Sequence, residues 1–298
     1  MRTIGVYREL WVLLLLATVF SLGHRPLRQE SPVSELSRWP KLYRDDGDGF
    51  LVIGHRGARA YYPENTLPSF RGAVEKGAEM IELDVQLSRD GYPVVFHDTD
   101  LKRCTDGRGR VADHTLEELK KLDAGSWFAH RFAGTRIPTL REVLEFAVGK
   151  IALNIEIKTE AVTDTLGDGV EEKCLRMVKE FGMEDHVIFS SFDYRALRHL
   201  RMLDGDIPVA LLYNKELSEG KSPARLTDAF DADAFNCSRR ELGRRWRRNL
   251  HKHDIPYMVY TVNNPRHMRQ LIENGAAGIF TDKPDLLRKV AETFDKMR

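Results

Sequence analysis

Short apolar runs that alternate with helix-like segments constrain the fold of this chain more than any other feature. Amphipathic stretches at residues 66–77, 139–149 and 264–276 have the periodicity of helices. Eight apolar runs are typical of β-strands, and they lie at residues 50–54, 80–85, 151–158, 187–192, 209–213, 234–237, 257–262 and 278–282. Eight strands separated mostly by helices, in a chain of 298 residues, predict an α/β fold of the (β/α)8 or TIM barrel type.

One further strand-like segment breaks this alternation. The run PVVFHD at residues 93–98 follows the strand at 80–85 too soon for the helical crossover that parallel neighbours need. Asp90 and Gly91 form a turn signal between the two runs, so we predict a hairpin above the barrel mouth. The returning arm would bring His97 toward the carboxyl ends of the strands. Residues 98–137 then form an excursion with one predicted helix at 115–123.

The N-terminus differs from the rest of the chain. Arg2 and Arg8 precede an unbroken run of apolar or small residues at 11–23, which has the length of a signal-sequence core rather than of a membrane span. We predict that residues 1–23 are a signal peptide or membrane anchor, and that the protein is exported (periplasmic or extracellular) or membrane-anchored. Residues 24–49 are polar, contain prolines and end in DDGDG, so we interpret them as a linker to a domain at 50–298.

The composition excludes several classes of function. A formal net charge of +1 gives no general attraction to nucleic acid. Three scattered cysteines, Cys104, Cys174 and Cys237, are too few for a disulfide framework or a thiolate metal site, and we expect them to be buried. No GxGxxG, Walker or GxSxG motif occurs, so nucleotide-binding and serine-hydrolase functions have no support.

Four charged residues lie within two of the predicted strands. Glu82 and Asp84 are two positions apart, as are Glu156 and Lys158, so each pair projects to one face of its strand. Apolar neighbours on the other face would pack under the helices, which leaves the charged face toward the barrel interior. Three inward carboxylates fit the oxygen ligands of one divalent cation, Ca2+ or Mg2+. The alternative is a buried ion-pair network in which Lys158 neutralises a carboxylate.

Two histidines and an arginine favour catalysis over a purely structural network. His55 and Arg56 directly follow the first predicted strand, at the barrel end where catalytic residues normally lie. Arg56 offers a forked donor that suits phosphate oxygens. The predicted hairpin brings His97 to the same mouth. Two histidines beside this charged cluster have no economical structural explanation.

The segments GHRGARAYYPENT, IELDVQLSRDGYPVVFHD, NIEIK, YTVN and GIFTDKP occur in this order, and together they resemble the glycerophosphodiester phosphodiesterase family. The resemblance covers roughly residues 51 to 290. It implies a TIM barrel with a small insertion after the HD motif, over the mouth. It also implies metal-dependent hydrolysis of small-molecule glycerophosphodiesters to glycerol 3-phosphate and an alcohol.

The site residues that the resemblance implies can be assigned position by position. His55 and His97 match the family's general acid and base, one activating water or a glycerol hydroxyl and the other protonating the leaving alcohol. Glu82, Asp84 and Glu156 match the metal ligands, and Arg56 and Lys158 match the phosphate contacts. Tyr260 stands where many members have Trp, so an aromatic wall is kept but its shape differs. We expect His97 to be the acid.

Two other functions stay open at this point. One is a lysophospholipase D that acts on lysophospholipids, and the other is a non-catalytic barrel that binds phosphorylated ligands. Residues 238–249 hold six arginines around Trp246, and they could contact anionic lipid headgroups at a membrane surface or form a solvated helix face. The oligomeric state is also left open.

Overall fold

The computed structural model describes residues 50–296, and the structural statements below concern that part of the chain. The expected signal peptide or anchor at 1–23 and the linker at 24–49 lie outside the described residues. Within residues 50–296, no helix combines the length and apolar character that crossing a membrane requires.

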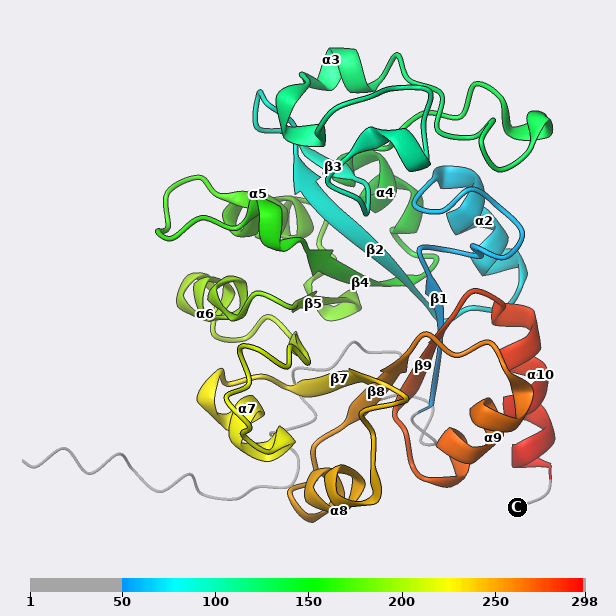
Figure 1. The fold of residues 1–298 in the computed structure, drawn as a ribbon, viewed down its shortest axis with the longest axis vertical. Coiled ribbons are helices and arrows are strands. Elements are labelled where there is room, and N and C mark those ends of the chain that lie inside the picture. The colour runs from blue at the N-terminus through cyan, green and yellow to red at the C-terminus, as the bar shows by residue number, and fades with distance from the viewer. Residues whose placement is uncertain (1–49, 297–298) are drawn as a thin grey trace, which may run out of the picture.

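Eight parallel strands close into a barrel, which confirms the predicted fold (Figure 1). Seven of them follow β1 around the sheet in the order β9, β8, β7, β6, β5, β4 and β2, and the β1–β2 pairing closes the ring. Each of the eight predicted runs overlaps one strand. The strands are β1 (Leu51–His55), β2 (Met80–Leu87), β4 (Ala152–Ile157), β5 (Val187–Ser191), β6 (Val209–Leu212), β7 (Ala234–Ser238), β8 (Tyr257–Tyr260) and β9 (Gly278–Thr281).

Helices surround the barrel, and their starts follow recognisable sequence signals. The Thr66 side chain accepts a hydrogen bond from the Ser69 amide at the start of α2, and Asn264 caps α9 in a similar way. Proline occupies the first turn of α2, α7, α9 and α10, where its missing N–H costs nothing. The outer helices are α2 (Leu67–Glu75), α4 (Leu140–Ala147), α5 (Val170–Glu180), α6 (Tyr194–Leu203), α7 (Pro223–Ala229), α8 (Arg244–Lys252), α9 (Pro265–Glu273) and α10 (Pro284–Asp295).

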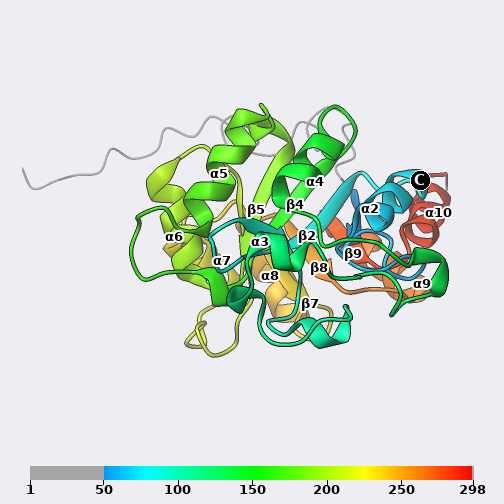
Figure 2. The same cartoon turned by 90° about the horizontal axis from the view of Figure 1, so that it is seen from above.

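The predicted hairpin is also present. Strand β3 (Pro93–Val95) pairs antiparallel with β2 and returns the chain toward the barrel mouth. The insertion that follows has a small apolar core of its own, which includes Leu101, Val111, Leu119 and Ile137. Seen from above, it lies over the strands of the barrel (Figure 2).

The helix of the insertion is shorter than predicted. Helix α3 spans Leu116–Leu119, whereas the sequence predicted a helix at 115–123. The Asp123 carboxylate accepts hydrogen bonds from the amides of Gly125, Ser126 and Gly134, which favours a turn over continuation of the helix. Single 3-10 turns occupy much of the remaining irregular chain, and they span Leu101–Arg103, Val111–Asp113, His130–Phe132, Thr159–Ala161 and Glu184–His186.

The alternation along β2 directs apolar side chains toward the helices and charged side chains toward the barrel axis. Ile81, Leu83 and Val85 are fully buried in the large core between strands and helices. Glu82 and Asp84 point to the opposite face, toward the barrel axis. The lower interior is filled by a second apolar cluster: Leu51, Ile53, Met80, Ala152, Ile188, Ala210, Ala234, Met258, Ala277 and Phe280. Charged groups are therefore confined to the upper end of the barrel.

We predict that Leu83→Ala lowers the free energy of unfolding by about 2–5 kcal/mol, because it leaves a cavity between β2 and the helices. Urea denaturation would measure this change. Leu217→Ala is the matched control, because its side chain is 48% exposed and the change should be within about 0.5 kcal/mol. A cost below about 1 kcal/mol for Leu83→Ala would contradict the assigned direction of this side chain.

Candidate active site

A cavity of about 350 Å³ lies at the carboxyl ends of the barrel strands. Six of the eight site residues predicted from the sequence line it, and the other two, Asp84 and Lys158, contact the lining residues from beside it. The hairpin carries His97 to the cavity, as predicted. The lining residues are His55, Arg56, Arg59, Glu82, His97, Glu156, Ser190, Phe192, Leu212, Tyr260, Thr261 and Phe280.

Three carboxylates from neighbouring strands converge beside this cavity. Strands β2 and β4 are paired so that Asp84 lies directly opposite Glu156, and Glu82 precedes Asp84 by two residues on the same face. One oxygen from each of the three carboxylates lies within 4.8 Å of the other two. Asp84 is fully buried and Glu82 is 4% exposed. Such a group needs nearby positive charge to remain ionised.

Arg56 and Lys158 supply positive charge from the ends of β1 and β4. The Arg56 amide donates to Glu82 Oε2 at 2.8 Å, and its Nε lies 3.2 Å from Asp84 Oδ2. Lys158 Nζ donates to Glu156 Oε1 at 2.8 Å and lies 3.4 Å from Asp84 Oδ1. This geometry corresponds to the ion-pair network considered from the sequence, and it holds Lys158 against the carboxylates.

Burial and charge separate the pKa values of the three acids. Burial raises the pKa of Glu82 well above its usual value, and the charges of Asp84 and Glu156 add to this effect. Burial also raises the pKa of Glu156 to about 7, with a further contribution from Asp84. Burial acts on Asp84 in the same direction, but Lys158 and Arg56 outweigh it and hold the pKa of Asp84 below its usual range.

The cluster has the donor set of a site for a hard cation. Asp84 Oδ1 is buried and accepts no hydrogen bond from any described residue, and the Lys158 ammonium 3.4 Å away offsets only part of the charge of the three carboxylates. A buried carboxylate oxygen without a hydrogen bond is costly unless a cation lies nearby, and carboxylate oxygens are the ligands that Ca2+ and Mg2+ prefer. Glu82, Asp84 and Glu156 could therefore bind a metal ion.

Each of the two histidines is oriented by a carboxylate. His55 Nδ1 lies 2.8 Å from Asp282 Oδ1, and His97 Nδ1 lies 2.6 Å from Asp98 Oδ1. A carboxylate at Nδ1 favours the tautomer with hydrogen on that atom, which leaves Nε2 as the free basic atom of each ring. Burial lowers the pKa of both histidines below 6.5, and neighbouring carboxylates oppose this effect.

Glu64 connects three arginines near the two histidines. Its carboxylate accepts hydrogen bonds from Arg56, Arg59 and Arg103, at 2.7 to 3.0 Å. Burial raises the pKa of Glu64, but Arg103 and Arg56 outweigh it, and the pKa falls to about 2. Arg103 also donates to Asp98, so it connects the insertion to the carboxylate behind His97.

The sequence alone did not identify several of these residues. Asp98, Asp282, Glu64 and Asn65 lie within the family-like segments, but no pattern in those segments by itself indicated a role. The Asn65 side chain donates to Asp84 Oδ2 at 2.8 Å. Asp282 directly follows strand β9, so its place at a strand end was a signal that could have identified it.

One side of the cavity is aromatic. The Tyr260 ring meets Phe192 edge-on at 5.9 Å and Phe280 at 6.3 Å. Burial raises the pKa of Tyr260, which keeps its hydroxyl protonated at neutral pH. The charged groups from β1, β2 and β4 form the opposite side, so the cavity has a polar half and an apolar half.

Comparisons with known proteins agree on the family of this chain. The glycerophosphoryl diester phosphodiesterase family matches residues 55–286. A glycerophosphodiester phosphodiesterase of Caldanaerobacter subterraneus subsp. tengcongensis is 41% identical over 238 residues, which cover 80% of this chain and 96% of that protein. A glycerophosphodiester phosphodiesterase of Bacillus subtilis is 35% identical over 284 residues, covering 89% of this chain and 93% of that protein.

A solved structure extends this agreement to the fold. A phosphodiesterase of Oleispira antarctica, in complex with the product sn-glycerol-3-phosphate, superposes with a TM-score of 0.70 at 29% identity. The match covers 80% of this chain and 96% of that chain. On the evidence of motif order, barrel and matched length, the chain belongs to the glycerophosphoryl diester phosphodiesterase family and is a phosphoric diester hydrolase.

Proposed function

We propose that this protein hydrolyses glycerophosphodiesters to glycerol 3-phosphate and an alcohol with the help of one divalent cation, Ca2+ or Mg2+. The observation that carries the proposal is a single cavity in which two carboxylate-oriented histidines face a three-carboxylate cluster. The relatives named above support the substrate class, because two are glycerophosphodiester phosphodiesterases and a third binds glycerol 3-phosphate as its product.

Positive groups of the chain meet the charge of the phosphodiester. Arg56 and Arg59 line the cavity, and both can donate to non-bridging phosphate oxygens. Lys158 offsets the carboxylates beside them. Glu82, Asp84 and Glu156 would hold the cation, which when bound supplies charge neutralisation of the phosphoryl oxygens in the transition state.

The surroundings of the two histidines favour different roles. His55 is the more buried, with 13% of its side chain exposed against 31% for His97. Burial favours the neutral ring, so His55 suits the base that takes a proton from the nucleophile. Burial also lowers the pKa of His97, but the charge of Asp84 opposes this effect and the side chain lies closer to solvent. We assign His97 as the acid that protonates the leaving alcohol.

The size of the cavity favours a small diester as substrate. A volume of about 350 Å³ is near the lower end of ligand pockets in general. The aromatic side formed by Phe192, Tyr260 and Phe280 gives the alcohol group an apolar surface. The acyl chain of a lysophospholipid would have to extend beyond this cavity. We therefore propose the deacylated diester ahead of the lysophospholipase D function.

His97→Ala should slow turnover of glycerophosphocholine by about 10²–10⁴-fold, because the leaving alcohol then lacks its acid. The same variant should lose far less on the 4-nitrophenyl diester of glycerol 3-phosphate, because nitrophenolate leaves without a proton. His55→Ala should slow both substrates. Values of kcat/KM for the two substrates would measure this. Equal losses on both substrates in both variants would contradict the assignment of acid and base.

Added Mg2+ or Ca2+ should raise Tm, and should raise it more at pH 8 than at pH 6. In the folded protein the pKa of Glu156 is about 7, whereas its ordinary value is 4.5. Between these two pH values, the folded state without metal therefore retains a proton that the unfolded chain has lost. The stability that this proton contributes is therefore lost as pH rises through 7. The cation binds the deprotonated form, so its effect grows over the same range.

Thermal unfolding with and without a chelator would measure the metal effect. Glu82→Gln keeps the shape of the side chain but removes a ligand charge, so the Tm increase should shrink strongly. Glu145→Gln is a matched control on the outer helix α4, and it should retain the full increase. If metal raises the Tm of Glu82→Gln as much as that of the wild-type protein, Glu82 is not a ligand.

Full-length protein should release glycerol 3-phosphate from glycerophosphocholine in a metal-dependent reaction, and should act at least tenfold less efficiently on lysophosphatidylcholine. The reason is the limited volume of the cavity beside its aromatic side. Product release from each substrate, with added Ca2+ or Mg2+ after chelation, would measure this preference and identify the ion. Preference for the lysolipid would assign the lysophospholipase D function instead.

A further inference from the structure

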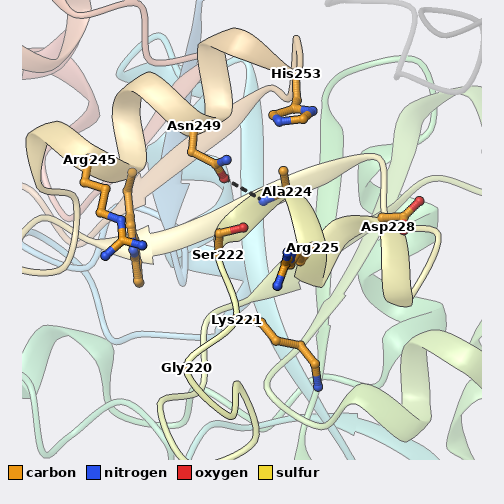
Figure 3. A pocket seen from close by; sticks show the side chains of 10 residues that line it. Gly220, Lys221, Ser222, Ala224, Arg225, Asp228, Arg245, Asn249 and His253 are labelled. Atoms are coloured by element: carbon orange, nitrogen blue, oxygen red, sulfur yellow. Dashed lines mark hydrogen bonds between the residues drawn. The ribbon is translucent and has the colours of Figure 1, made fainter.

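A second and larger cavity lies on the outer wall of the barrel, between helices α7 and α8 (Figure 3). Its volume is about 860 Å³, and none of its lining residues belongs to the candidate active site. Asn249 on α8 accepts a hydrogen bond from the Ala224 amide at 2.9 Å, which joins the two helices at this point. The two helices that bound the cavity are therefore joined directly by a hydrogen bond.

Positive side chains dominate the lining of this cavity. Lys221 and Arg225 lie on the α7 side and Arg245 on α8, as Figure 3 shows, and Asp228 is the one acidic residue of the lining. Lys221 pairs with Glu219. Within residues 50–296, neither Arg225 nor Arg245 has an acidic side chain within 4.0 Å. Two arginines without acidic partners suit an anionic ligand.

The charge extends from the cavity along the adjoining helix and loop. Residues 238–253 contain six arginines and one lysine against one glutamate, a net charge of +6 in a chain whose total is +1. Arg244, Arg248 and Lys252 are exposed on α8, while Arg247 donates to Asn274. We call residues 238–253 together with Lys221 and Arg225 the basic patch.

The upper end of the basic patch adjoins the mouth of the active site. A helix that follows a parallel strand runs back along it, so the N-terminus of α8 lies at the carboxyl end of β7. Leu212 lines the active-site cavity, and the next residue, Tyr213, contacts Trp246 in the second cavity at a ring distance of 4.6 Å. The same β6–α7 connection exposes Leu217, whose side chain is 48% accessible.

We infer that the basic patch docks the catalytic domain on an anionic phospholipid bilayer, with a lipid phosphate group entering the cavity between α7 and α8. Spread-out arginines match the dispersed negative charge of a bilayer, and exposed Leu217 can enter the apolar layer beneath the headgroups. A single soluble phosphate could contact only the cavity and would leave the exposed arginines of α8 without a partner, so it should bind far more weakly than a bilayer. Docking on this side would place the active-site mouth near the membrane surface.

Sedimentation of the full-length protein with vesicles tests this inference. The two samples are phosphatidylcholine alone and phosphatidylcholine with 30% phosphatidylglycerol, at about 0.1 M salt. The anionic lipid should increase wild-type binding, and Arg225→Gln with Arg245→Gln should weaken that added binding by on the order of tenfold. The N-terminal segment is present in every variant, so it contributes equally to all comparisons.

Arg266→Gln with Arg269→Gln is the matched control, because it removes the same charge from exposed positions on α9. It should retain most of the anionic-lipid binding, and both double variants should hydrolyse soluble diesters at the wild-type rate. Equal losses in the two double variants would overturn a specific docking site. If the Arg225 and Arg245 variant binds anionic vesicles as strongly as the wild-type protein, the inference is also overturned.

A second readout distinguishes the bilayer from a free anion. Inorganic phosphate at millimolar concentration should raise Tm equally in the wild-type protein and the Arg225 and Arg245 variant. If phosphate instead stabilises only the wild-type protein, and anionic vesicles bind both proteins alike, the cavity is a site for soluble phosphates and the bilayer inference is wrong.

Discussion

Three carboxylates buried together inside the barrel are the constraint on which the site depends. Parallel pairing of β2 with β4 places Asp84 opposite Glu156, so two like charges meet in the barrel interior. An isolated buried charge costs several kcal/mol, and proximity adds repulsion. Arg56 and Lys158 offset part of this cost and keep Asp84 ionised, while the pKa values of the two glutamates rise. The cluster is therefore arranged to accept one more positive charge.

A second set of ion pairs holds the reacting groups in place. Arg56 is itself fixed by Glu64, and Arg103 connects Glu64 to Asp98 behind His97. Arg56 and Asn65 both adopt positive φ, 53° and 56°, a conformation that costs non-glycine residues energy and is found at functional sites. The insertion contributes Arg103, so it stabilises the histidine on the hairpin as well as lying over the mouth.

The fold and the centre of the site could be predicted because they depend on local patterns. Alternation along β2 and β4 identified Glu82, Asp84 and Glu156, and the short spacing before PVVFHD identified the hairpin. Pairings across the closed ring depend on more than a local pattern, which can show that Asp282 ends a strand but does not name its partner. Asp282 orients His55 across 227 positions because β9 lies beside β1, and strand order is a property of the whole barrel. The Glu64–Arg103 pair likewise depends on how the insertion folds back.

The division of the cavity into two halves explains how one chemistry can serve different alcohols. Charge is handled by residues on β1, β2, β4 and the hairpin, whereas on the opposite side the Tyr260 ring packs against Phe192 and Phe280. A substitution on the aromatic side changes the surface offered to the alcohol without moving a carboxylate or a histidine. We propose that Tyr260, on this aromatic side, bears on which alcohol is released rather than on the phosphoryl chemistry.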